Sequence, residues 1–280
     1  MVPNLLTPFS VSLDTLNRHL KSLYDADWDD PRGAICFSAD VKLDELARAD
    51  VFHNARIFLN ALLEAGGTAT TATGNLTRAF VSDVCDRLRL APTSLQIRRS
   101  HCKAINEQDI WPLHKVRLLA EYGKLVARRK RRFVVTKLGR ELMADERAGE
   151  LFRRLFLTYF RTMDLCYLVR VRETPEIQAT LAITLWRLEQ VAENWRAVKG
   201  MAAQILPSRV MTRIVSEQRG DFDTPDFFVS AYVLRPLHEF GLLERQRKSE
   251  WQLGEKDTVR VTPLFRRFIR FAELPSPMNN

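Results

Sequence analysis

The chain has 280 residues, of which 46% are hydrophobic and 28% are charged, and its formal net charge is +9. This composition is typical of a soluble globular protein, and the length suffices for one large domain or two modest ones. No apolar run reaches the roughly 18 residues that a membrane span requires. The N-terminus lacks the basic and small-residue features of a secretory signal. We therefore expect a cytoplasmic protein without a membrane partner.

The charge is unevenly distributed along the chain. Residues 1–51 hold five Lys or Arg and nine Asp or Glu, a net charge of −4, so the remainder carries +13. A basic body attracts polyanions, and this attraction weakens as salt is added. The alternative is a high arginine content that serves no specific partner.

The first 50 residues are predicted to form an acidic leader with short helices. Leucines spaced by three or four positions over 11–25 are typical of an amphipathic helix, and 43–50 can add one or two helical turns. An acidic loop from Asp25 to Asp30 separates the two.

A first folded module is predicted over residues 51–145. Its expected elements are helices at 51–65, 76–90, 109–122 and 137–143, a strand at 68–73, and a hairpin with strands at 124–127 and 132–136. The order helix, strand, helix, helix, hairpin, helix is that of a winged helix. In this fold a β-hairpin wing follows the helix that enters the nucleic-acid groove.

The middle of the chain, 146–220, is predicted to be entirely helical. Its first helix carries a stripe of large apolar side chains, which favours a core position over a base-stacking platform. These side chains are Phe152, Phe156, Tyr159, Phe160, Met163 and Tyr167. Further helices are predicted over 174–191, 195–206 and 210–217.

The signature of the first hairpin occurs a second time, within residues 221–274. A helix over 226–241, a hairpin within 242–262 and a closing helix over 263–273 repeat the pattern, and 275–280 is predicted to be a disordered tail. Pairing Gly123 with Gly241 as equivalent helix ends predicts that the two modules superpose. The expected fold is therefore mainly α, with two winged-helix-like modules linked by a helical middle region.

Four short motifs in the first module carry a resemblance to a known family. They are Thr71-Ala72-Thr73-Gly74-Asn75-Leu76, Leu113-His114, the run from Leu118 to Val126, and the run from Val135 to Arg140. Residues 51–145 resemble the winged-helix-like segment of an uncharacterised family of bacterial plasmid and transposon-passenger proteins, the plasmid ORF-three-like proteins. More weakly, residues 226–273 resemble MarR-type winged-helix regulators through Gly241 to Arg245. The resemblance implies a fold and leaves the function open.

Five consecutive cations occupy the tip of the first hairpin, where Gly, Asn or Asp is usual. They are Arg128, Arg129, Lys130, Arg131 and Arg132. At a wing tip such side chains can contact a phosphate backbone or a minor groove. The alternatives are a solvated turn, or a surface that pairs with the acidic leader.

Three smaller groups of residues are further candidates for nucleic-acid contact. In helix 109–122 the outward positions are expected to be His114, Lys115 and Arg117. Their side chains could contact phosphates or guanine edges. Trp111 and Pro112 count against this interpretation, because a helix that enters a groove usually begins with small polar residues. The other two groups are Arg98 with Arg99, for which a solvated loop is the alternative, and the second hairpin's Arg245, Arg247 and Lys248.

No motif for catalysis, cofactor binding or metal binding is recognisable. The chain has no Walker loop, no G-x-G-x-x-G and no H-E-x-x-H, and its four cysteines form no C-x-x-C pair. We therefore expect a non-enzymatic protein that binds double-stranded DNA, as a regulator or accessory factor of mobile-element or phage-defence type. The alternatives are an interaction scaffold whose modules assemble with a protein partner or as a homodimer, and an enzyme or toxin with a degenerate site.

Overall fold

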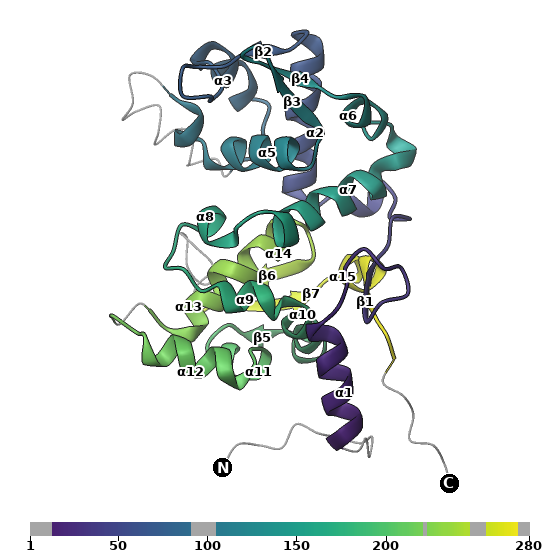
Figure 1. Ribbon diagram of the computed structural model, residues 1–280, viewed down its shortest axis with the longest axis vertical. Helices are drawn as coiled ribbons and strands as arrows, with labels where there is room; N and C mark the ends of the chain where they lie inside the picture. The colour runs from purple at the N-terminus through teal and green to yellow at the C-terminus, as the bar shows by residue number, and fades with distance from the viewer. Residues whose placement is uncertain (1–12, 91–104, 221–222, 247–255, 274–280) are drawn as a thin grey trace.

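The computed structural model describes residues 13–90, 105–220, 223–246 and 256–273. The described chain is mainly helical, as predicted, with three small antiparallel sheets. Figure 1 shows an upper and a lower part stacked along the long axis, with α7 (Ala148–Leu157) between them. Among the described residues, no helix combines the length and apolarity that crossing a membrane requires.

The upper part contains the first hairpin. Its helices and strands are α2 (Asp50–Glu64), β2 (Thr68–Ala69), α3 (Arg78–Cys85), α5 (Trp111–Tyr122), β3 (Val126–Arg129), β4 (Arg132–Val135) and α6 (Lys137–Glu141). The three strands form one sheet in the order β2-β4-β3, and α5 packs along α2. The expected strand 68–73 ends at Ala69 because the chain turns back at once, with the Gly74 amide donating to the Thr71 carbonyl at 3.0 Å.

The lower part begins with α1 (Leu13–Tyr24) and β1 (Ile35–Phe37) and resumes after α7. It continues with α8 (Leu165–Val169), α9 (Pro175–Ala179), α10 (Leu181–Val191), β5 (Arg196–Ala197), α11 (Ala202–Ile205), α12 (Ser208–Ser216), α13 (Pro225–Val229), α14 (Arg235–Glu239), β6 (Leu243–Gln246), β7 (Thr258–Val261), α15 (Pro263–Phe268) and β8 (Ile269–Phe271). Strands β5, β7 and β6 form a second sheet of the same order as the first. The prediction of an all-helical middle is therefore wrong at β5, whose pairing with β7 overrides its local helical pattern.

The third sheet joins the two ends of the described chain. Strand β1 pairs with β8 in antiparallel register, with Cys36 opposite Arg270. The expected closing helix 263–273 is thus too long, because the chain leaves α15 at Phe268 to make this sheet. Residues of the predicted acidic leader are in this way part of the folded body.

Equivalent hydrogen bonds lie before and after the two hairpins. The Leu125 amide donates to the Ala120 carbonyl at 2.8 Å, and the Leu242 amide donates to the Leu237 carbonyl at the same distance. After each hairpin a threonine side chain caps the next helix, Thr136 in the first and Thr262 in the second. The internal repeat seen in the sequence is therefore also a repeat of local structure.

The pairing of Gly123 with Gly241 is wrong by one residue. At the end of α5 the left-handed position is taken by Lys124, with a φ of 59°, whereas Gly123 has a φ of −72°. In the second copy Gly241 itself is left-handed, with a φ of 71°. Glycine is preferred in this conformation because it has no Cβ, so a sequence alignment matches the two glycines and misses the lysine.

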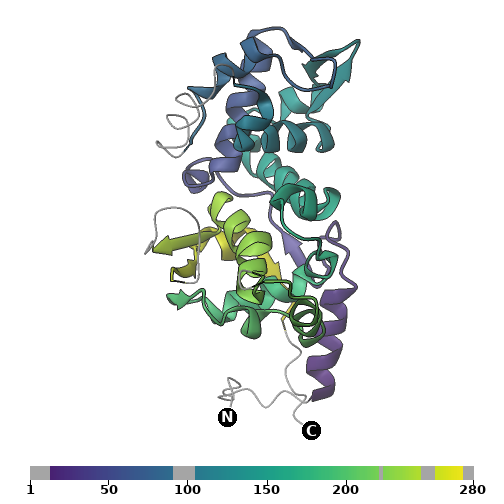
Figure 2. The ribbon, with the colours of Figure 1, turned by 90° about the vertical axis from the view of Figure 1, so that its left-hand side faces the viewer.

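Helix α7 lies between the two parts (Figure 2) and contributes aromatic side chains to the core. Phe152 and Phe156 contact the rings of Phe240 and Phe268, with centroid distances between 4.7 and 5.7 Å. The prediction that the aromatic stripe forms core is confirmed for these residues. Tyr167, the last of the stripe, is the exception, because it lies on α8 and is 51% exposed.

Candidate nucleic-acid interface

The turn between β3 and β4 is built from two left-handed cations. Lys130 and Arg131 have φ values of 46° and 60°, the combination that a two-residue type I′ hairpin turn requires. Asn-Gly is the preferred sequence for such a turn, since a left-handed side chain costs about 1–2 kcal/mol per residue. Strain of this kind is typical of functional positions.

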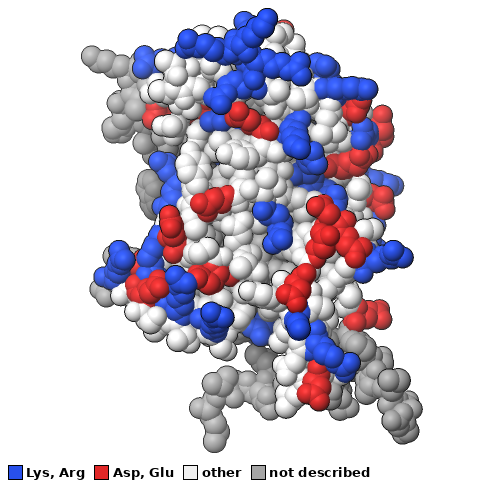
Figure 3. Space-filling model, viewed as in Figure 1, with Lys and Arg blue, Asp and Glu red and all other residues white. Residues whose placement is uncertain are grey.

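All five cations from Arg128 to Arg132 are exposed. Arg132 donates to the Gly67 carbonyl at 3.0 Å, and Arg128 Nε lies 4.0 Å from a Glu121 carboxylate oxygen. Arg129, Lys130 and Arg131 form no ion pair with any residue in the described ranges. Figure 3 shows Lys and Arg side chains gathered over the top of the molecule, where Figure 1 places this sheet.

The acidic leader does not cover this tip with any of its described residues. Asp29 pairs with Arg153 on α7, and Glu45 pairs with Arg267 on α15. The interpretation of the tip as a partner of the leader therefore finds no support in the described chain.

A shallow hollow of about 390 Å³ lies beside the hairpin, lined by Thr70, Thr71, Ala72, Thr73, Gly74, Arg128 and Arg131. Residues 70–76 form a loop, called here the threonine loop. The Thr70 amide donates to the Arg131 carbonyl at 2.9 Å, which ties this loop to the turn. A Cβ on Gly74 would lie 2.6 Å from Arg128 Nη1, so only glycine lets this guanidinium lie against the loop. Hydroxyl groups and two arginines thus border one hollow, a donor set suited to phosphate oxygens.

The prediction that α5 presents an outward basic face is wrong. His114, Lys115 and Arg117 are only 2%, 5% and 6% exposed. They are buried because α5 packs against α2 on one side and the segment after α7 on the other. Lys115 bonds to Glu239 of α14, so its charge is neutralised by the lower part of the molecule.

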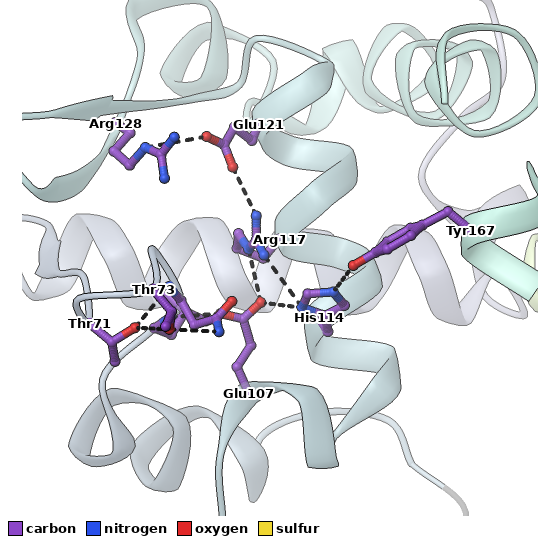
Figure 4. A network of polar contacts seen from close by, with 10 residues as sticks. Thr71, Thr73, Glu107, His114, Arg117, Glu121, Arg128 and Tyr167 are labelled. Atoms are coloured by element: carbon purple, nitrogen blue, oxygen red, sulfur yellow. Dashed lines mark hydrogen bonds and ion pairs between the residues drawn. The ribbon is translucent and has the colours of Figure 1, made fainter. Parts of the chain in front are cut away.

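Glu107, just before α5, is the centre of a buried polar network (Figure 4). Its carboxylate accepts from the Leu76 amide at 2.6 Å, from His114 Nδ1 at 2.5 Å and from Arg117 Nε at 2.9 Å. Arg117 also donates to Glu121 at 2.9 Å. The network therefore links the threonine loop to α5 and, through Glu121, approaches Arg128.

Burial alone would raise the pKa of Glu107. The hydrogen bonds from His114, the Leu76 amide and Arg117, together with the positive charge of Arg117, outweigh it, so the pKa of this carboxyl lies below its usual value. Glu107 is therefore an ionised carboxylate at neutral pH, and His114 and Arg117 are committed to it. Neither side chain is free to contact phosphates or a nucleic-acid groove.

The second hairpin differs from the first in its charged residues. Arg245 is buried in an ion pair with Asp257, with an Nη2–Oδ2 distance of 2.6 Å and exposed side-chain fractions of 8% and 0%. The prediction of Arg245 as an exposed wing cation is therefore wrong, because its guanidinium neutralises a buried carboxylate. Arg98, Arg99, Arg247 and Lys248 lie outside the described residues.

Two components of this region were not predicted from the sequence. Residues 70–73 were expected to be part of a strand, although Gly74-Asn75 indicated where the chain turns. No sequence pattern indicated the role of Glu107. A single glutamate becomes the centre of a polar network only when folding brings its three hydrogen-bond donors to it.

Residues 47–149, a little over a third of the chain, match the family model described as the Y4jL N-terminal domain. The match spans the segment 51–145 and supports the prediction that it belongs to an uncharacterised plasmid-type family. Neither the curated proteins nor the solved structures give a significant match.

Proposed function

We propose that this protein binds nucleic acid, with double-stranded DNA as the first candidate, through the β3–β4 hairpin and the threonine loop beside it. The observation that supports the proposal best is the turn itself. Lys130 and Arg131 adopt a conformation that favours Asn-Gly, and neither has an ion-pair partner among the described residues. The turn is thus less stable than an Asn-Gly turn would be, and in exchange it exposes two positive charges. On this proposal both hairpin modules are winged-helix-like.

The proposed contact is with the sugar-phosphate backbone. Base reading in a winged helix needs an exposed helix before the wing, and here α5 is buried from Leu113 to Ala120. Arginine forks and hydroxyl groups bind phosphate without reading sequence. We therefore expect weak sequence preference and a strong dependence on salt, as befits an accessory factor rather than a site-specific repressor.

The second module has a different role in this proposal. Its hairpin arginine is neutralised by Asp257, and a Cβ on Gly241 would lie 3.0–3.1 Å from the backbone of Arg48 and Ala49. Both features suit docking within the molecule. They favour the scaffold alternative for this module only.

The test replaces Lys130→Asn and Arg131→Gly together, because this pair suits the turn and removes both charges. Binding of a mixed-sequence 20-bp duplex is measured by fluorescence anisotropy between 25 and 200 mM salt. We expect about a tenfold loss of affinity at low salt, and the slope of log K against log salt should fall by up to about 2.

The matched control is Lys199→Asn with Arg209→Gln, which removes two exposed charges from the lower part of the molecule. Its affinity should stay within about twofold of the parent protein, since these positions lie outside the proposed contact. The proposal is wrong if the control loses as much affinity as the turn variant, or if the parent protein binds no nucleic acid.

A further inference from the structure

A second hollow of about 300 Å³ lies at the start of α5 and is bordered on its other side by α8. It is lined by Gln108, Trp111, His114, Cys166, Tyr167 and Arg170. Its volume is at the lower limit of small-ligand clefts, which span about 300–1,000 Å³. None of its lining residues belongs to the hairpin or to the threonine loop.

Two aromatic side chains border this hollow instead of joining the core. Tyr167 is 51% exposed, whereas the other rings of its stripe are fully buried. The Trp111 and Tyr167 rings lie 6.4 Å apart between centroids and are inclined at 52°. Two rings contributed by different helices thus line one hollow.

Arg170 adds a cation held in a strained conformation. It ends α8 with a φ of 57°, a position where glycine is usual, and its guanidinium lies 4.7 Å from the centroid of the Trp111 ring. The described non-glycine residues with positive φ are Lys124, Lys130, Arg131 and Arg170, so all four are cations. Left-handed Asn or Asp would be the ordinary choice, and strain of this kind concentrates at binding sites.

His114, which lines the hollow, holds the Tyr167 side chain in place. His114 Nδ1 is bound to Glu107, which leaves Nε2 to interact with the Tyr167 hydroxyl at 3.1 Å. Figure 4 shows this chain of contacts running from Glu107 through His114 to Tyr167. An exposed aromatic ring that is fixed in this way loses little conformational entropy when a ligand stacks on it.

A nucleobase matches these features. Every base has a π face that stacks on aromatic rings and on guanidinium planes, and the Gln108 amide and Arg170 can bond to the edges of a base. In a duplex the base faces are already stacked, so only an unpaired base can enter. We propose that the Trp111–Tyr167–Arg170 hollow binds one unpaired nucleobase of a strand whose backbone lies on the β3–β4 hairpin. The inference rests on the proposed function for the backbone contact.

The test compares two 12-nucleotide single strands of the same length and charge, one of mixed sequence and one with abasic sites at its centre. Both are titrated against the full chain at fixed salt. We expect the complete strand to bind about tenfold more tightly than the abasic one, because stacking is lost with the bases. Equal affinities would overturn the inference.

Arg170→Gly is the decisive variant, because glycine suits the left-handed position and the fold is retained. We expect it to lower the affinity for the complete strand by about tenfold and to leave the affinity for the abasic strand and for a duplex within about twofold. Tyr167→Ala should behave likewise. A uniform loss for all three ligands would mean that Arg170 acts only as a surface charge, and the inference would then be wrong.

Arg161→Ala is the matched control, since Arg161 is also exposed and lies 5.1 Å from a tryptophan ring, that of Trp28, outside the hollow. It should leave all three affinities unchanged. The Lys130→Asn/Arg131→Gly variant separates the two proposals. It should lower the affinity for all three ligands by a similar factor. The ratio of the affinities for the complete and the abasic strand should stay the same. If that variant has no effect while Arg170→Gly abolishes the ratio, the hairpin proposal fails and the base site stands.

Discussion

At the scale of single residues, charge is used in two opposite ways. Lys130 and Arg131 are exposed, and the turn that carries them is less stable than an Asn-Gly turn. Glu107, His114 and Arg117 are buried and satisfy one another. The first arrangement suits a ligand, and the second fixes the loop and the helix on either side of it.

The buried network predicts a specific effect of Glu107→Gln on stability. Removing one member of a buried ionic group costs about 3–5 kcal/mol, because the remaining charge loses its partner. The pKa of Glu107 is lower in the folded than in the unfolded state, so its contribution is present above about pH 4.5 and lost as the pH falls further. Urea unfolding should therefore show a large deficit at pH 7 and a smaller one at pH 3. A deficit that does not change with pH would contradict this assignment.

At the scale of elements, the two hairpins share a backbone frame and differ in what they present. Each follows a helix and a left-handed residue, Lys124 in the first copy and Gly241 in the second, and each is followed by a threonine cap. The first hairpin ends in exposed cations, whereas the second buries Arg245 against Asp257. Backbone geometry therefore repeats while the surface chemistry does not.

The buried pair in the second hairpin predicts a non-additive result. Asp257→Ala should destabilise the protein by about 3–5 kcal/mol, because the buried Arg245 guanidinium would lose the carboxylate with which it forms an ion pair. The double variant Arg245→Met/Asp257→Leu should recover most of this loss, since an apolar pair avoids desolvated charge. Denaturant unfolding of the single and double variants measures the coupling. If the double variant is no more stable than Asp257→Ala, the ion pair is not the cause of the loss.

At the scale of the whole molecule, the two ends of the described chain and the two hairpin modules meet around α7. Strand β1 pairs with β8, and Phe37 contacts Phe156 of α7 and Phe268 of α15 at centroid distances of 5.2 and 5.5 Å. Phe240, next to the second hairpin, packs on the same helix. Phe52 of α2 contacts Phe152 of α7 at a centroid distance of 6.3 Å, so the upper and lower parts are joined by one aromatic core.

This arrangement predicts that the N-terminal segment is required for stability. Phe37→Ala should cost about 3–5 kcal/mol and should raise hydrogen exchange in Ile269–Phe271, because the side chain anchors β1 in the core. Tyr24→Ala is the control in the same segment, since Tyr24 is 57% exposed and its loss should cost no more than about 0.5 kcal/mol. If Phe37→Ala costs no more free energy of unfolding than Tyr24→Ala, the N-terminal segment is not required for stability.

Features that depend on neighbouring residues could be predicted from the sequence alone. Helical periodicity located α2 and α5, glycine and basic residues located the first hairpin, and the aromatic stripe of α7 was recognised as core. The repeated signature also indicated two similar hairpins, although glycine matching shifted their register by one residue.

Which polar residues are accessible depends on how distant segments of the chain pack together. His114, Lys115 and Arg117 look outward by helical spacing, yet their partners Glu107 and Glu239 lie 7 to 124 residues away in the chain. The β1–β8 sheet likewise joins segments more than 200 residues apart. A local pattern cannot indicate such contacts, because the free energy that favours them arises only when distant segments are packed together.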